Sequence, residues 1–319
     1  MAEVNFNVHR LVSSFYRYNQ QRLISFTCGE PMESKHIRAW KLDCVVGQHG
    51  DFILHELSLA TAPQSLDSLS ATLPQGGYTT FRTYQQVSMI GWKNHMLRLA
   101  DTARIHETPV EIPEECIRRA LRMILHSFEA GDYRVRITID LSEQIGDIYI
   151  AAEALSPIPE QAYRTGVKTV TCRHQRSLPD AKLTNFIRTA TQIRQDLPAD
   201  VNEAVMVNEQ GELLEGLSSN VFFVIGSELY TAGKNVLAGI TRSMAIRAAQ
   251  SEKLPIHYES VAFDKLSQCE EVFLTSASRG ILPVVQVDQQ VIGAGLPGPV
   301  TRRLMQRFQT VICQELVEL

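Results

Sequence analysis

The stretch ELLEGLSSNVFFV, residues 212–224, places one carboxylate and three hydrogen-bonding side chains directly in front of an apolar run. Glu215 is followed by a glycine, by a polar segment at 218–220 and by four apolar residues that fit a buried strand. Taken alone, the stretch also fits a hairpin that turns at residues 208–211, with Glu215 as a solvated strand residue. The rest of the chain has to decide whether Glu215 has a chemical role.

The composition is that of a folded protein and excludes several classes of function. The chain has 319 residues, of which 44% are hydrophobic and 21% charged, as in a globular enzyme. The formal net charge is -4 and no long basic run occurs, so we expect neither nucleic acid nor a membrane as partner. No apolar run approaches membrane-spanning length.

Six cysteines lie far apart, at positions 28, 44, 116, 172, 269 and 313. None forms a C-x-x-C pair or clusters with histidines at metal-ligand spacing, so we expect no metal site. Scattered cysteines in a chain of this length indicate buried thiols in a reducing compartment. The N-terminal sequence MAEVNFNVHRLVSSFYRYNQ lacks the apolar core of a signal peptide, and we therefore expect a cytoplasmic protein.

Hydrophobic patterns divide the chain into an α+β arrangement of two domains. Strands are predicted over residues 23–27, 42–46, 52–59, 78–84, 133–141, 147–152, 167–172, 203–207, 216–225, 271–275 and 281–287. Helices are predicted over 92–105 with Asn94 as cap, over 114–128, after Lys182, from about 241, and over 297–316. The segment LSPIPEQAYRTG, residues 155–166, is rich in proline and glycine, so we expect a linker between domains of residues 1–154 and 167–319.

Three further features carry possible chemistry. Residues 239–242 predict a helix that begins directly after a glycine. Its N-terminus is either an anion site or an ordinary helix start capped by Thr241. The small residues 276–278 follow an apolar strand and would let the backbone approach a ligand. Lys182 lies at a loop-to-helix junction, where a lone lysine is usually a solvated charge. Each feature alone has an ordinary structural explanation.

The order and spacing of these features are more specific than any one of them. Lys182 has Asn185 three residues on, and EGLSSNVF at 215–222, LAGITR at 237–242 and a strand that ends at residues 275–276 follow. This order resembles that of the class IV, or fold type IV, pyridoxal-phosphate enzymes, which include branched-chain aminotransferases, D-amino-acid aminotransferases and aminodeoxychorismate lyases. YTTFRTY at 78–84 resembles the family's G-x-F-E-T-x-R strand, and NHMLRLADTARI at 94–105 its H-x-x-R-L-x-x-S-A helix. The resemblance covers about residues 76–287, whereas residues 1–70 have no match.

The resemblance implies a smaller N-terminal α/β domain, a C-terminal pseudo-barrel α/β domain and the cofactor pyridoxal 5'-phosphate. Lys182 would be the catalytic lysine, which forms an imine with the cofactor aldehyde and shuttles a proton. Glu215 would face the pyridine nitrogen and keep it protonated, so that the ring accepts the electrons of the broken C–H bond. This role would explain the carboxylate of the stretch at 212–224.

The resemblance also implies the rest of the cofactor site. The implied cofactor-binding residues are Arg98, Lys182, Glu215, Ser219, Asn220, Leu237, Gly239, Ile240, Thr241, Ser276 and Ala277. Residues 218–220 would orient Glu215, Leu237 would pack on the ring, and residues 240–241, 276–277 and Arg98 would hold the phosphate. The alternative for Arg98 is a plain charge on the surface of its helix.

Three departures from the family pattern fall near the expected substrate pocket. Phe186 stands where branched-chain enzymes carry a tyrosine that bonds the cofactor's ring oxygen. Arg279 and the following glycine stand where the family has a small residue and an acid, and Thr79 or Thr80 where it often has Glu. The resemblance therefore says less about the substrate than about the cofactor.

The substrate carboxylate requires a cation or a set of N–H groups. Residues 133–141 alternate, with an apolar face at Val135, Ile137, Ile139 and Leu141 and a polar face at Arg134, Arg136, Thr138 and Asp140. Arg134 and Arg136 are the first candidates for the substrate carboxylate, with Arg82 and Arg279 behind them. The alternative for each is an ordinary ion pair.

The expected function is transfer of an amino group between an amino acid and a 2-oxo acid, by a homodimer with its site near the subunit boundary, as the resemblance implies. A lyase of the aminodeoxychorismate type uses the same cofactor and lysine and stays open. A non-catalytic binding protein on an old enzyme fold is a third possibility. The presence of both Lys182 and Glu215 argues against it, since packing would require neither.

Overall fold

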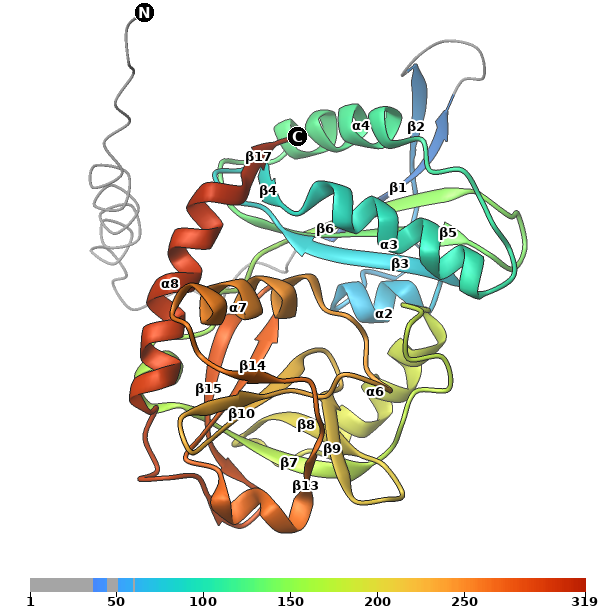
Figure 1. The fold of residues 1–319 in the computed structure, drawn as a ribbon. Helices are drawn as coiled ribbons and strands as arrows, with labels where there is room; N and C mark the ends of the chain where they lie inside the picture. The colour runs from blue at the N-terminus through green and yellow to red at the C-terminus, as the bar shows by residue number, and fades with distance from the viewer. Residues whose placement is uncertain (1–36, 45–50, 60) are drawn as a thin grey trace, which may run out of the picture. The chain divides into compact units, whose positions relative to one another are not determined.

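Two β-sheets organise the part of the chain that the structure describes (Figure 1). The structure is a computed structural model, and it describes residues 37–44, 51–59 and 61–319. The smaller sheet has five strands, all antiparallel to their neighbours. Their spatial order is β2 (Phe52–Glu56), β1 (Arg38–Cys44), β6 (Ile148–Ala154), β5 (Tyr133–Asp140) and β3 (Gly76–Arg82).

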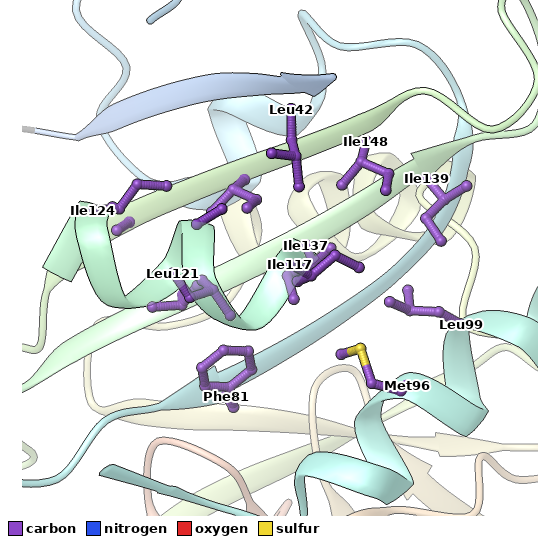
Figure 2. Packing of buried hydrophobic residues seen from close by; sticks show 14 of the residues in the cluster. Leu42, Phe81, Met96, Leu99, Ile117, Leu121, Ile124, Ile137, Ile139 and Ile148 are labelled. Atoms are coloured by element: carbon purple, nitrogen blue, oxygen red, sulfur yellow. The ribbon is translucent and has the colours of Figure 1, made fainter. Parts of the chain in front are cut away.

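Two helices, α3 (Trp92–Ile105) and α4 (Glu114–His126), pack against one face of the five-stranded sheet. Figure 2 shows Leu121 of α4 and Met96 and Leu99 of α3 grouped with Phe81 and Ile137 of the strands. These side chains are at most 2% exposed. Burying a side chain of this size stabilises the fold by about 1.5–3 kcal/mol. The core therefore fixes α3, the helix that carries Arg98.

The predicted alternation along residues 133–141 is confirmed, because Val135, Ile137 and Ile139 are all buried in this core. On the opposite, polar face Arg136, Thr138 and Asp140 are buried as well, whereas Arg134 is partly exposed. The reason is the short helix α2 (Leu66–Ser70), which lies on that side of the sheet (Figure 1). Arg136 donates to the Leu66 carbonyl at 2.8 Å and to the Ser70 hydroxyl at 2.6 Å.

The larger sheet has ten strands and closes on itself like a barrel. Along the sheet lie β12 (Ile256–His257), β11 (Glu228–Tyr230), β10 (Asn220–Ile225), β14 (Glu271–Ser276), β15 (Gly280–Val287), β7 (Val167–Arg173), β8 (Val201–Val207), β9 (Glu212–Gly216) and β13 (Val261–Ala262). The strand β16 (Gln290–Val291) pairs with β15. The closing contact joins β9 to β10, where Glu215 pairs with Asn220. The stretch at 212–224 therefore forms the seam of this sheet.

The remaining elements pack around the larger sheet or join it to the smaller one. They are α5 (Glu160–Thr165), α6 (Asn185–Gln195), α7 (Ile240–Ser251), the 3-10 helix η1 (Phe263–Gln268), α8 (Pro299–Glu315), β4 (Ser88–Ile90) and β17 (Leu316–Glu318). Helices α7 and α8 contact each other and β14. The pairing of β17 with β4 then ties the end of α8 to the start of α3.

The segment at 155–166 differs from the expected loose linker. Its second half forms α5, and Ile158, Ala162 and Tyr163 pack against the core of the larger sheet. The Tyr163 hydroxyl also donates to the Arg279 carbonyl at 2.8 Å. The expected linker is therefore packed against a domain core, because a few apolar side chains at helical spacing are enough to dock one helical turn. The domain boundaries themselves stay a prediction.

Three smaller expectations need correction or fall outside the described residues. Gly91, with φ +70°, and not Asn94, precedes the first residue of α3. Cys44 and Cys116 form a disulfide instead of two buried thiols, because packing brings the end of β1 to the first turn of α4. A separation of 72 residues carried no sign of this pairing. Cys28 and the strand expected at 23–27 lie outside the described residues.

Neither a membrane-spanning helix nor a cluster of metal-ligating side chains occurs in residues 37–44, 51–59 and 61–319. No helix there is both long and apolar enough to cross a bilayer. No three His, Cys, Asp or Glu side chains there gather so that they could hold one metal ion.

Candidate active site

Lys182 lies where the second half of the chain runs along the edge strand β3 of the five-stranded sheet. Its carbonyl oxygen accepts a hydrogen bond from the Tyr78 N–H at 2.9 Å. Two residues on, the Thr184 N–H donates to the Gly76 carbonyl and the Thr184 hydroxyl accepts from the Gly76 N–H, both at 2.9 Å. The backbone is thus fixed beside Lys182, which gives its side chain a defined direction.

The Lys182 amine lies among aromatic and cationic groups. Its Nζ is 4.7 Å from the centroid of the Tyr78 ring. Burial lowers the pKa of Lys182 to about 8; Tyr78 opposes this shift, and the positive charges of Arg176, Arg98 and Arg136 add to it. A lysine of this pKa exists partly as the neutral amine near neutral pH, which is the form that attacks a carbonyl and takes up a proton.

Glu215 is only 2% exposed, and both of its carboxylate oxygens accept hydrogen bonds. Oε1 accepts from Arg176 Nε at 2.9 Å. Oε2 accepts from the Leu237 N–H at 3.2 Å and from the Asn220 amide at 3.4 Å. Burial raises the pKa of Glu215, and the Arg176 charge and the Leu237 N–H act against the rise. The alternative of a solvated strand residue is excluded by this burial.

Arg176, in the loop between β7 and α6, is the main site residue that the sequence did not indicate. It is 7% exposed, and its guanidinium carbon lies 3.7 Å from the centroid of the Phe186 ring. Its Nη1 is buried without a hydrogen-bond partner among the described residues. Phe186, the first departure from the family pattern, therefore supports the cation that pairs with Glu215. A lone arginine in a loop carries no sequence signal of such a role.

The loop in front of α7 is held against Glu215 by Asn220. The Asn220 amide donates to the Leu237 carbonyl at 2.8 Å. At Gly239 a Cβ atom would lie 2.0 Å from the Asn220 side-chain oxygen, so only glycine fits there. From the other sheet's helix α3, Arg98 donates to the Ala238 carbonyl. This loop therefore brings residues of both halves of the chain together.

The start of α7 is the helix N-terminus for which the sequence left open an anion site or an ordinary helix start. The helix begins at Ile240, and its first N–H groups have no intrahelical partner. Burial, together with the like charge of Arg176, lowers the pKa of Arg98 to about 10, so this guanidinium stays charged near neutral pH. A helix N-terminus beside a charged arginine suits a phosphate group.

The polar residues of the segment at 218–220 have different partners. Asn220 is the one that contacts Glu215, whereas the Ser218 and Ser219 hydroxyls donate to Glu203 Oε2 at 2.9 and 3.3 Å. Glu203 is 1% exposed and also accepts from Arg279 at 2.6 Å. The two serines therefore hold the strand entry through a second buried carboxylate.

The small-residue turn at Ser276 and Ala277 lies next to this polar cluster. It follows Thr275, which pairs with Asn220 across β10 and β14. The Ser276 hydroxyl accepts from Arg279 Nε at 2.9 Å. The register thus places the turn beside the Asn220 end of β10, near the loop that precedes α7.

The departure at Thr79 has a local counterpart in α3. The Thr79 hydroxyl lies 2.6 Å from His95 Nδ1, and both side chains are buried. Burial, followed by the charges of Arg98 and Lys182, holds the pKa of His95 well below its usual value. The hydroxyl thus serves a neutral histidine, where a glutamate would add a buried charge.

All four arginines proposed for the substrate carboxylate have acidic partners in the structure. The pairs are Arg82–Asp132 (2.7 Å), Arg134–Glu153 (3.0 Å), Arg136–Asp67 (2.6 Å) and Arg279–Glu203 (2.6 Å). Arg136 is distinguished by its place, because its guanidinium carbon lies 4.8 Å from the centroid of the Tyr78 ring that Lys182 also contacts. Their substrate roles stay predictions.

Comparison with known proteins accounts for this arrangement. Residues 76–287 match the family model of the class IV aminotransferases. A Thermotoga maritima protein named "Probable branched-chain-amino-acid aminotransferase" is 28% identical over 243 residues, which cover 74% of this chain and 85% of the relative. A D-alanine aminotransferase of Bacillus licheniformis is 31% identical over 160 residues, or 49% of this chain and 56% of the relative.

The fold is shared with solved structures as well. A branched-chain amino acid aminotransferase solved with pyridoxamine 5'-phosphate superposes with a TM-score of 0.70 at 22% identity, covering 90% of this chain and 99% of that one. The chain belongs to the class IV aminotransferase family. The predicted α+β fold type IV architecture is confirmed, and the chain is a pyridoxal-phosphate-dependent transaminase.

Proposed function

We propose that this chain moves an amino group between an amino acid and a 2-oxo acid with pyridoxal 5'-phosphate held by Lys182. The observation that supports it most is the half-buried Lys182 amine, with a pKa of about 8, in one site with the buried Glu215–Arg176 pair and the start of α7. The donor set fits the cofactor. A lysine suits its aldehyde, a buried carboxylate suits its ring nitrogen, and helix N–H groups with Arg98 suit its phosphate.

The cofactor supplies, when bound, an aldehyde carbon that carries the amino group and a ring that accepts an electron pair. The Lys182 amine would hold that carbon in the resting protein. It would then take the proton from the substrate α-carbon and deliver it to the same cofactor carbon. Glu215 would hold a proton on the ring nitrogen. Arg176 would keep Glu215 ionised in spite of its burial.

Phosphate binding is assigned to Arg98, to the N–H groups of Ile240 and Thr241, and to the turn at 276–277. Gly239 lets the backbone approach, and Leu237, whose N–H is fixed by Glu215, would present its side chain to the ring. For the substrate α-carboxylate, Arg136 is favoured among the four arginines because it shares the Tyr78 ring with Lys182.

Assembly and location remain proposals. The family resemblance supports a homodimer with the site near the subunit boundary. The expectation of a cytoplasmic protein drew on scattered, reduced cysteines, and the Cys44–Cys116 disulfide weakens that argument. The comparisons give the lyase alternative no better support than the aminotransferase.

The proposed function is tested by incubating the purified protein, loaded with pyridoxal phosphate, with single L- and D-amino acids and following its visible absorbance. We expect bleaching by some amino acids and recovery of the colour when a 2-oxo acid is added. Bleaching by one enantiomeric series would also settle the stereochemistry. Release of pyruvate without a 2-oxo acid would instead indicate a lyase, and colour without any bleaching a non-catalytic protein.

The Lys182 pKa predicts how cofactor capture depends on pH. Because the neutral amine attacks the aldehyde and burial lowers the pKa to about 8, the capture rate of the apoprotein should rise with pH and level off above that value. Stopped-flow absorbance at a fixed cofactor concentration measures this rate. A rate that keeps rising up to the ordinary lysine value of 10.5 would contradict the prediction.

A further inference from the structure

Three arginines surround the single carboxylate of Asp67 in α2. Arg136 Nη2 lies 2.6 Å from Asp67 Oδ1, Arg194 Nη1 lies 3.2 Å from Oδ2, and Arg134 lies 3.9 Å from Oδ1. Although burial disfavours the charged form, these arginines hold the pKa of Asp67 below its usual value. Asp67 is therefore an ionised carboxylate that the chain itself supplies to an arginine cluster.

This cluster borders the reacting lysine. Arg136 Cζ and Lys182 Nζ lie 4.8 and 4.7 Å from the centroid of the same ring, that of Tyr78 in strand β3. A substrate whose amino group is exchanged at Lys182 would therefore extend its other polar groups toward the region of Arg136. A carboxylate two or three carbons from the α-carbon would meet Asp67 there.

The net charge of the cluster can balance one bound carboxylate but not two. Arg134, Arg136 and Arg194 face Asp67 and Glu153, and Arg194 also lies 4.0 Å from Glu203, which pairs with Arg279. These are four arginines against three carboxylates. One positive charge remains in excess. Every amino acid and 2-oxo acid brings one α-carboxylate, which this excess matches. A second carboxylate would be repelled by Asp67, since like charges at close range disfavour binding.

We propose that Asp67 determines the substrate class of this enzyme, by neutralising Arg136 and Arg194 so that amino acids and 2-oxo acids with uncharged side chains are accepted and dicarboxylic ones are rejected. The proposal rests on the proposed function, because it concerns the second polar group of a substrate bound at Lys182. It gives α2 a role in specificity, although the family resemblance begins only at residue 76.

The variant Asp67→Asn removes the charge and keeps the helix in place. Arg136 still donates to the Leu66 carbonyl and the Ser70 hydroxyl. The capping box between Ser65 and Ser68 is also untouched. The asparagine oxygen can accept one of the former hydrogen bonds. The change therefore acts on charge and not on the fold of α2.

The test compares glutamate with glutamine, which have nearly the same shape and differ in one charge. We expect the ratio of kcat/KM for glutamate to kcat/KM for glutamine to rise by about tenfold or more in Asp67→Asn. Asp67→Glu, which keeps the charge, and Asp200→Asn, which removes an exposed carboxylate paired with Lys168, should leave the ratio unchanged. An unchanged ratio in Asp67→Asn overturns the proposal.

A second measurement uses the wild type alone and so does not depend on the variant's folding. Glutarate and its monoamide are compared as competitive inhibitors, and we expect the monoamide to bind at least as well. Tighter binding of glutarate by about tenfold overturns the proposal. If no amino acid at all bleaches the loaded wild type, the proposed function fails, which is a different outcome from a wrong ratio.

Discussion

Lys182→Ala is expected to lower kcat/KM of the amino-group exchange by roughly ten thousandfold or more, because the same amine holds the cofactor and moves the α-proton. The visible absorbance of the cofactor-loaded protein should also change, since no covalent bond to the chain can form. Steady-state kinetics with an active amino donor and an absorption spectrum measure both effects.

Lys168→Ala is the matched control for this variant. Lys168 is an exposed lysine of β7 that pairs with Asp200 at 2.8 Å, and it has no part in the proposed site. We expect its activity to stay close to that of the wild type, because exposed ion pairs contribute little. A Lys182→Ala protein that keeps more than about one hundredth of the wild-type activity would contradict the assignment of Lys182.

Glu215→Leu is expected to abolish activity and to lower the free energy of unfolding of the apoprotein by about 3–5 kcal/mol, because it leaves Arg176 as an unpaired charge in a buried position. Arg176 cannot lose its proton to escape this cost. Urea denaturation of the apoprotein gives the stability, and amino-donor kinetics give the activity.

The double variant Glu215→Leu with Arg176→Met separates the two effects. Replacing both members of a buried pair by apolar side chains is often neutral for stability, so most of the lost free energy should return. Activity should not return, because no carboxylate faces the ring nitrogen. Recovery of activity in the double variant would show that Glu215 acts only by pairing with Arg176. Glu315→Leu, which breaks the far more exposed pair with Arg247, should have little effect on either measure.

The sequence determined those parts of the protein that are local or that depend on spacing. The range of α3 was predicted without error, because hydrophobic period and turn residues act over one element. The single strand expected at 216–225 was wrong: the structure has β9 and β10 there, with residues 217–219 as a bend between them and Glu215 inside β9. The order Lys182, Glu215, Asn220, Gly239 carried the resemblance to the class IV enzymes, and that resemblance implies the cofactor site. Burial of Glu215 and the clamp of Asn220 on Leu237 agree with this interpretation.

Only the tertiary structure decided which distant residues meet. Arg176 pairs with Glu215 across 39 positions of sequence, Asp67 meets Arg136 across 69, and Cys44 joins Cys116 across 72. No periodicity in the sequence encodes such contacts, since they arise where sheets close and helices dock. The ion pairs of the four candidate arginines follow from the same packing. From the sequence, Arg136 is a free cation for the substrate carboxylate, but in the folded chain Asp67 pairs with it. The substrate class therefore depends on a contact that only the tertiary structure makes.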